Sequence, residues 1–133
     1  MSRTSTASGI VLRTSRQLAF TVLCSIVLPV ALAQEQAVTP KEIQDTWVSK
    51  TLVGRTAGGA AATLKLESDG TASVSAGATN DSGTWRVSDQ GYCTTWKNIR
   101  SGQERCFIAR RVGTTIKVFN LDGSPSGEFT EIR

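Results

Sequence analysis

The residue types best suited to chemistry gather in one stretch of the chain, residues 83–111. It holds two of the three tryptophans, the only tyrosine and two of the three cysteines. Six basic residues stand there against two acidic ones, a local net charge of +4. Clustered cations beside aromatic side chains are typical of an anion-binding surface. The competing interpretation is the solvated surface of a β-hairpin, and the sequence leaves both open.

Histidine is absent from the chain, and its only methionine is the initiator. This excludes histidine general-base catalysis, histidine zinc sites and haem held by histidine or methionine. The sequence also lacks a Gly-x-Ser-x-Gly nucleophile elbow, and nothing singles out two carboxylates as a glycosidase pair. We therefore expect a protein that is not an enzyme and that has no cofactor and no metal.

Cys93 and Cys106 are predicted to form a disulfide. The third cysteine, Cys24, lies in a segment that we expect to be removed, and an even number of cysteines in an oxidising compartment favours a disulfide over a metal or catalytic pair. Placing Cys93 opposite Cys106 on antiparallel strands puts Tyr92 across from Phe107 and fixes the register. In the chain-entropy model such a loop contributes about 3 kcal/mol.

The same register suggests two sets of binding residues. It puts Arg105 on the aromatic face of the hairpin, and a buried arginine needs a partner or a ligand. If that face is the inside of a barrel, Arg105 is the best single candidate for contact with an anionic ligand. The candidate ligand-binding residues are Arg105, Trp85, Tyr92, Trp96 and Phe107. A candidate anion-binding face consists of Lys97, Arg100, Arg110 and Arg111.

Residues 1–33 have the pattern of a cleaved signal peptide. Three arginines precede an apolar run from Leu18 to Val30, and Ala31-Leu32-Ala33 is a small-residue cleavage pattern. The run is shorter than the roughly 20 residues that a membrane-spanning helix needs. We expect a periplasmic or secreted protein with no membrane span after cleavage, and the alternative is an uncleaved membrane anchor.

Cleavage would change the charge of the protein. The full chain carries a net charge of +4, but residues 1–33 hold three basic residues and no acidic one, so the remaining 100 residues have 12 basic and 11 acidic residues, a net of +1. A nucleic-acid partner thus loses its compositional support. A chain of this length forms one domain with one core, and we expect a monomer.

The first predicted element after the signal is a short helix. Residues 34–38 are expected to be a flexible lead-in. Thr39-Pro40-Lys41-Glu42 is a capping-box sequence, which predicts a helix over about 40–48. One turn separates Ile43 from Trp47, so both should pack on the same surface.

The rest of the single domain, residues 39–133, is predicted to be all-β. From residue 51 onward apolar and polar residues alternate, and glycine-containing turns recur at spacings of about 8 to 12 residues. This pattern predicts about eight short strands in an antiparallel meander. The meander closes into a small up-and-down barrel, or alternatively forms a strongly curved sheet capped by the helix.

Several short motifs resemble those of a family of small exported proteobacterial proteins of unknown function. They are Gly83-Thr84-Trp85, Cys93-x-x-Trp96 and Arg105-Cys106-Phe107, and the likeness covers nearly the whole chain after residue 33. The resemblance implies export, the disulfide and a β-rich fold, and nothing catalytic. A looser likeness of fold connects the chain to lipocalin and avidin barrels and to small periplasmic barrels that inhibit secreted metalloproteases.

Two functions from different classes follow as hypotheses. The first is a non-catalytic periplasmic module that binds a small apolar or anionic ligand among the aromatic residues. The second is a protein-interaction module, such as an inhibitor of a secreted hydrolase, that uses residues 34–38 or the loop at 97–102. The partner is accordingly either a small ligand or an envelope protein.

Overall fold

The computed structural model describes residue 9 and residues 34–133. Apart from residue 9, the predicted signal peptide, with Cys24, therefore lies outside the described residues. Among the helices of the described part, none has the length and apolar character that crossing a membrane requires.

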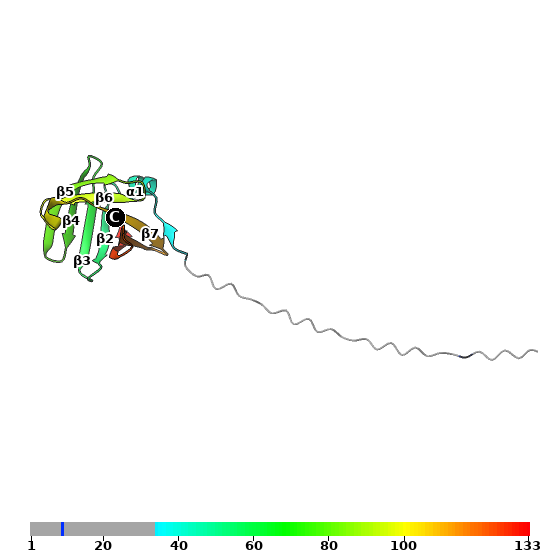
Figure 1. Cartoon of the computed structure of the whole chain (residues 1–133). Coiled ribbons are helices and arrows are strands. Elements are labelled where there is room, and N and C mark those ends of the chain that lie inside the picture. The colour runs from blue at the N-terminus through cyan, green and yellow to red at the C-terminus, as the bar shows by residue number, and fades with distance from the viewer. Residues whose placement is uncertain (1–8, 10–33) are drawn as a thin grey trace, which may run out of the picture. The chain divides into compact units, whose positions relative to one another are not determined.

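The described chain folds into an antiparallel β-barrel with one short helix (Figure 1). Its elements in chain order are β1 (Gln36–Ala37), α1 (Pro40–Thr46), β2 (Thr51–Thr56), β3 (Ala61–Leu66), β4 (Thr71–Ala76), β5 (Thr79–Val87), β6 (Tyr92–Trp96), the 3₁₀ turn η1 (Ile99–Gly102), β7 (Arg105–Val112), β8 (Thr115–Asn120) and β9 (Pro125–Ile132). Neighbours in sequence pair from β2 to β7, β8 pairs with both β7 and β9, and β9 returns to β2. The eight strands thus close on themselves, and the prediction of an all-β meander forming a barrel is confirmed.

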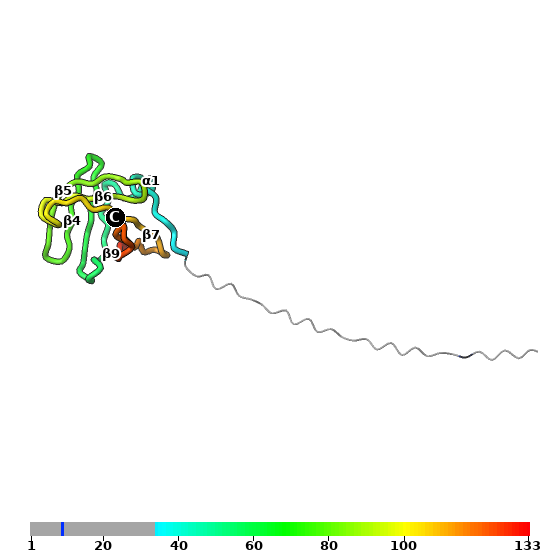
Figure 2. Tube along the Cα trace, viewed as in Figure 1, coloured from blue at the N-terminus to red at the C-terminus, as the bar shows by residue number. Residues whose placement is uncertain are grey.

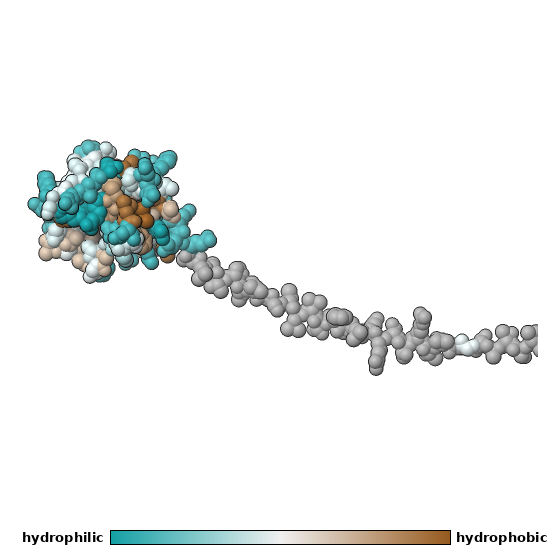
Figure 3. Space-filling model, viewed as in Figure 1, coloured by the Kyte–Doolittle hydropathy of each residue, from teal (hydrophilic) through white to brown (hydrophobic). Residues whose placement is uncertain are grey.

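The predicted alternation of side chains decides what lies inside the barrel. Leu64 and Leu66 on β3 are buried, as are Ile116 and Val118 on β8, while the residues between them are more exposed. Figure 2 shows the strands wrapped around this shared interior. In the view of Figure 3, hydrophilic residues cover much of the barrel, and the most hydrophobic residues gather mainly in one patch. Burial of the alternate apolar side chains is the main favourable term in folding.

The glycine of the Gly-Thr-Trp motif has a structural role in closing the barrel. A Cβ added at Gly83 would lie 1.9 Å from the carbonyl oxygen of Thr95 on the neighbouring strand, and one at Gly54 would lie 1.8 Å from that of Glu128. Real atoms do not approach so closely. Glycine is therefore required where these strands cross at short range.

Helix α1 closes one end of the barrel. The Thr39 hydroxyl caps it by accepting from the backbone N–H of Glu42 at 3.1 Å, and Ile43 and Trp47 are fully buried. The helix is shorter than predicted, because Trp47 is already its C-cap and Ser49 adopts a left-handed conformation with φ +61°. The chain thereby turns directly into β2.

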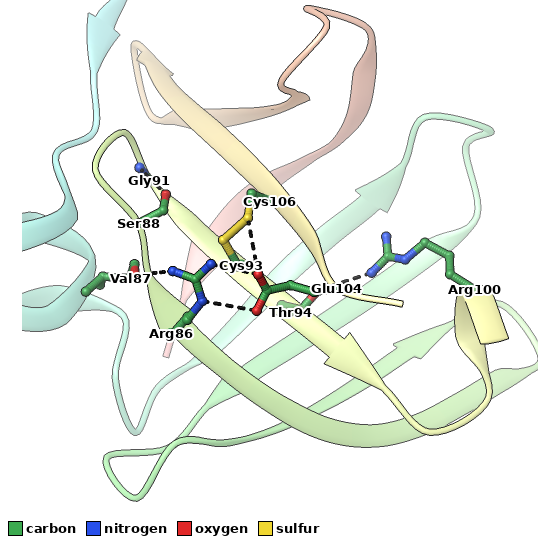
Figure 4. Close-up of a disulfide and its surroundings, with 9 residues drawn as sticks. All are labelled: Arg86, Val87, Ser88, Gly91, Cys93, Thr94, Arg100, Glu104 and Cys106. Atoms are coloured by element: carbon green, nitrogen blue, oxygen red, sulfur yellow. Dashed lines mark hydrogen bonds and ion pairs between the residues drawn. A yellow bond between two sulfur atoms is a disulfide. The ribbon is translucent and has the colours of Figure 1, made fainter. Parts of the chain in front are cut away.

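The disulfide joins Cys93 to Cys106 in the predicted register. Tyr92 pairs with Phe107, Cys93 with Cys106, and Thr94 with the first residue of β7. Figure 4 shows the bridge beside an ion pair in which Arg86 donates two hydrogen bonds to Glu104, at 3.0 and 2.7 Å. Glu104 Oε1 also lies 3.9 Å from Cys106 Sγ, which is a contact and not a hydrogen bond, because a disulfide sulfur has no proton to donate.

Part of the predicted flexible lead-in pairs with the barrel as a short strand outside the closed ring of eight. Gln36 and Ala37 form β1 and pair with β7, and the Val38 N–H donates to the carbonyl of Ala109 at 2.9 Å. The reason lies in β7: only its first three residues pair with β6, which leaves the backbone groups of the rest of that edge for β1. Val38 is 2% exposed.

Candidate ligand cavity at the open end of the barrel

A cavity of about 180 Å³ lies inside the barrel and opens to solvent at the end away from α1. Most of its lining residues come from the parts of the strands remote from the helix and from η1. They are Arg55, Thr56, Ala62, Thr63, Leu64, Val74, Ala76, Tyr92, Thr94, Trp96, Ile99, Arg100, Phe107, Val118, Ser126, Gly127 and Phe129. The lining is mostly apolar with a few polar groups, which is the usual composition of a small-molecule site.

Small residues facing inward leave this space unfilled. Ala62 on β3 pairs with Ala76 on β4, and Gly127 on β9 has no side chain. The floor of the cavity is formed by Tyr92 and Phe129, whose rings pack edge-on against the Trp47 ring with centroids 5.6 and 6.3 Å away. The cavity therefore begins where the aromatic packing of the helix end stops.

Arg100 places a cation at this cavity. Its Nη2 donates to the Thr94 hydroxyl at 3.2 Å, and its guanidinium carbon lies 5.5 Å from the centre of the Phe107 ring. Its Nε is covered from solvent, yet it has no acceptor among the described residues. Burial, with the nearby charge of Arg105, lowers the pKa of Arg100, and an arginine remains charged nonetheless.

The loop before β7 is what carries Arg100 to the cavity. The Asp81 carboxylate on β5 accepts from the backbone N–H groups of Asn98 and Ile99 at 2.9 and 2.8 Å. These bonds, that from Ile99 first, hold the pKa of Asp81 below its usual value of 3.8. Beyond this anchor, Arg100 and Ser101 have φ of 56° and 53°, a left-handed conformation that is unfavourable for both.

The electrostatic character of the cavity is positive. Two arginines and no aspartate or glutamate stand among the described residues that line it. Arg55 is exposed at the rim, where its Nη1 donates to the carbonyl of Gly59 at 3.2 Å. Arg100 reaches farther in, so an anion entering the cavity meets no carboxylate and one partly desolvated guanidinium.

The structure distributes the five candidate ligand-binding residues differently from the prediction. Tyr92, Trp96 and Phe107 line the cavity. Trp85 does not: it is partly buried against the core, and its indole N–H donates to the carbonyl of Glu67 at 2.7 Å. Arg105 does not line it either, which corrects its placement on an enclosed face. Strand pairing with β6 ends at Arg105, so the aromatic face is no longer enclosed there and the side chain is exposed.

The four residues of the candidate anion-binding face do not form one face. Arg111 pairs with Glu42 of α1, and Arg110 pairs with Glu35 at 3.1 Å while stacking over the Phe119 ring. Adjacent strand residues point to opposite sides, so these two arginines could not share a face. Lys97 is exposed, and Arg100 belongs to the cavity.

Sequence reasoning named only Tyr92, Trp96 and Phe107 among the residues that line the cavity as ligand-binding candidates, and it placed Arg100 elsewhere. Thr94 and Arg55 were not expected there, and Arg100 was expected on the outer surface. The small inward residues of β3 and β4 could be seen in the alternation of the sequence, and they mark where space remains. The left-handed turn that directs Arg100 could not be seen, because its first two positions are not glycine.

The described residues contain one cluster of three side chains whose types could hold a metal ion, Cys93, Glu104 and Cys106. Its two sulfurs are bonded to each other, so neither is available as a thiolate ligand.

No protein-family model, curated protein or solved structure matches this chain. The resemblance to a family of small exported proteobacterial proteins therefore stays a prediction. What the chain does has to be inferred from the barrel and its cavity.

Proposed function

We propose that this protein is a non-catalytic, exported ligand-binding module that holds one small molecule in the open end of its barrel. The observation that carries the proposal is Arg100. A charged side chain lines a mostly apolar cavity, where it donates to the Thr94 hydroxyl at 3.2 Å. A guanidinium keeps its charge and carries five N–H donors, so its presence at an apolar cavity favours an anionic ligand there.

The form of the cavity supports the same proposal. It is open to solvent, its walls belong to paired strands, and its mouth is bounded by a loop anchored through Asp81. A site built on strands is already formed before a ligand arrives, which lowers the entropic penalty of binding. The signal-peptide pattern and the disulfide support a periplasmic or secreted setting for this binding.

The test is native mass spectrometry of the protein purified after export, with a variant that fills the cavity. We expect the wild type to carry an additional small mass that is absent from Ala62→Phe. Ala60→Phe is the matched control, because Ala60 is exposed and does not line the cavity. Circular dichroism checks that both variants fold. The proposal is contradicted if the wild type carries no additional mass and no compound of a small-molecule library raises its melting temperature.

The alternative function, a protein-interaction module that inhibits a secreted hydrolase, has weaker support. Residues 36–38 are tied to β7 and are not a free arm, which leaves the loop at 97–102. In that loop Ile99 packs against the core and Arg100 is directed inward. Enrichment of one envelope hydrolase on immobilised protein, lost on changing the exposed Lys97 to alanine, would favour this alternative.

A further inference from the structure

We propose that the cavity takes a monocarboxylate whose apolar part is about the size of one aromatic ring. This inference rests on the proposed function and narrows it to a ligand class. The size of the cavity, its charge and the hydrogen-bond donors inside it each carry part of the argument.

The volume limits the apolar part of the ligand. An apolar protein cavity of about 150 Å³ binds one benzene molecule. The cavity here measures about 180 Å³, which leaves room for one ring or a short branched chain together with a carboxylate. A long acyl chain would not fit, because Tyr92 and Phe129 close the floor against Trp47.

The charges on the lining favour a single negative charge. Arg100 is the only cation that reaches inside among the described lining residues, since Arg55 is exposed at the rim. One guanidinium offsets one negative charge. A phosphate monoester dianion would keep an uncompensated charge in a partly desolvated site, which is strongly unfavourable.

Three side chains with hydrogen-bond donors line the cavity: Arg100, Thr94 and Tyr92. Arg100 offers the N–H groups of its guanidinium, and Thr94, which accepts from Arg100 Nη2, offers its hydroxyl proton. Tyr92 also lines the cavity, and its ring lies 5.3 Å from that of Phe107, over which Arg100 stacks. Burial raises the pKa of Tyr92, so its hydroxyl keeps its proton and can donate. Two carboxylate oxygens can accept all three bonds.

The same geometry orients the ligand. With the carboxylate at Arg100 and Thr94, the apolar part lies against Leu64, Val74 and Trp96. Specificity then comes from a charge-assisted contact at one side of the ligand and from shape at the other.

Calorimetric titration of the exported protein with four probes tests the inference: benzoate, its neutral isostere benzamide, phenyl phosphate and dodecanoate. We expect benzoate to bind at least tenfold more tightly than each of the other three, because hydrogen bonds to charged groups contribute about 1.5–3 kcal/mol and 1.4 kcal/mol is tenfold. Arg100→Gln should abolish the preference for benzoate over benzamide. Arg105→Gln removes a neighbouring charge outside the cavity and should retain it.

The outcomes separate the two proposals. Equal binding of benzoate and benzamide, or tighter binding of phenyl phosphate or dodecanoate, overturns the monocarboxylate inference and leaves a ligand-binding barrel standing. Loss of the preference in Arg105→Gln as well as in Arg100→Gln also overturns it, because a general surface potential would then be responsible. If no probe binds, the inference fails. Native mass spectrometry of the exported protein then decides whether the proposed function stands.

Discussion

The two ends of the barrel are built from the same strands but are finished in opposite ways. At the helix end, Ile43 and Trp47 fill the interior, and Trp47 contacts two further rings. At the open end, paired alanines and a glycine leave about 180 Å³ empty, and the loop directs Arg100 toward that space. One end contributes most of the packing, and the other keeps a cation beside a cavity.

This difference shows how a small barrel divides stability from binding. Close-packed interiors resist changes of even one methylene group, whereas a cavity that is open to solvent has room for them. The change in the free energy of unfolding caused by a substitution should therefore differ in size, and even in sign, between the two ends. The following predictions test that contrast, from the largest expected effect to the smallest.

Trp47→Ala is expected to lower the free energy of unfolding by about 3–5 kcal/mol, because it leaves a large hole in the packed end. Its indole N–H has no acceptor among the described residues, so Trp47→Phe, which keeps a ring, should be milder. Ile99→Ala at the open end, where the side chain is partly buried, should also be milder. Urea unfolding measures all three, and equal losses at the two ends would contradict the contrast.

Ala72 and Ala76 on β4 provide a matched pair, because both side chains face inward and each lies near a different end of the barrel. Ala72 is 4% exposed at the packed end, so Ala72→Leu should destabilise the protein by about 1–3 kcal/mol through overpacking. Ala76 lines the cavity, and Ala76→Leu should change the stability by less than about 0.5 kcal/mol while blocking benzoate binding. If Ala76→Leu destabilises as much as Ala72→Leu, the open end is already filled.

Each end also has a serine in the left-handed conformation, Ser49 with φ 61° and Ser101 with φ 53°. Glycine adopts this conformation without steric strain, so each serine-to-glycine change should raise the stability by about 0.5–1 kcal/mol. Only Ser101→Gly should weaken benzoate binding, because it loosens the loop that directs Arg100. Thermal unfolding and titration measure the two effects, and weaker binding in Ser49→Gly would contradict the assignment.

The smallest expected effect is a local pH dependence at the loop anchor. The pKa of Asp81 is lowered from 3.8 chiefly by the Ile99 N–H, so its bonds to the loop are intact above pH 3.8 and are lost as the pH falls through the lowered pKa. The amide resonances of Asn98 and Ile99 should titrate with a midpoint below 3.8, and Asp81→Asn should remove the titration. A midpoint at or above 3.8 in the wild type would show that the anchor is not formed.

Much of the fold could be predicted because it depends on local patterns. The capping sequence at Thr39 predicted the helix, alternation predicted the strands, and the two cysteines predicted the register of β6 and β7. Two expectations that differ from the structure depended on where strand pairing stops. Arg105 was expected on an enclosed aromatic face, but pairing ends at that residue, and residues 34–38 were expected to be free, but a vacant edge of β7 holds β1.

The candidate site was predictable in part for the same reason. Tyr92, Trp96 and Phe107 follow from strand register, which is a property of two neighbouring segments. Arg100 does not, because its direction depends on two left-handed residues and on a carboxylate of β5, 19 positions earlier in the chain. No pattern of residue types encodes that direction.

The sequence by itself determined the alternating strands, the capped helix, the cysteine pair and the positions of the small inward residues, because each arises from residues close together in the chain or from a simple count. Only the tertiary structure decided which end of the barrel is filled and which cations are paired within the chain. It also decided that Arg100, and not Arg105, borders the cavity. These outcomes depend on contacts between segments far apart in the chain, where the direction of one loop or the end of one strand pair changes what a side chain meets.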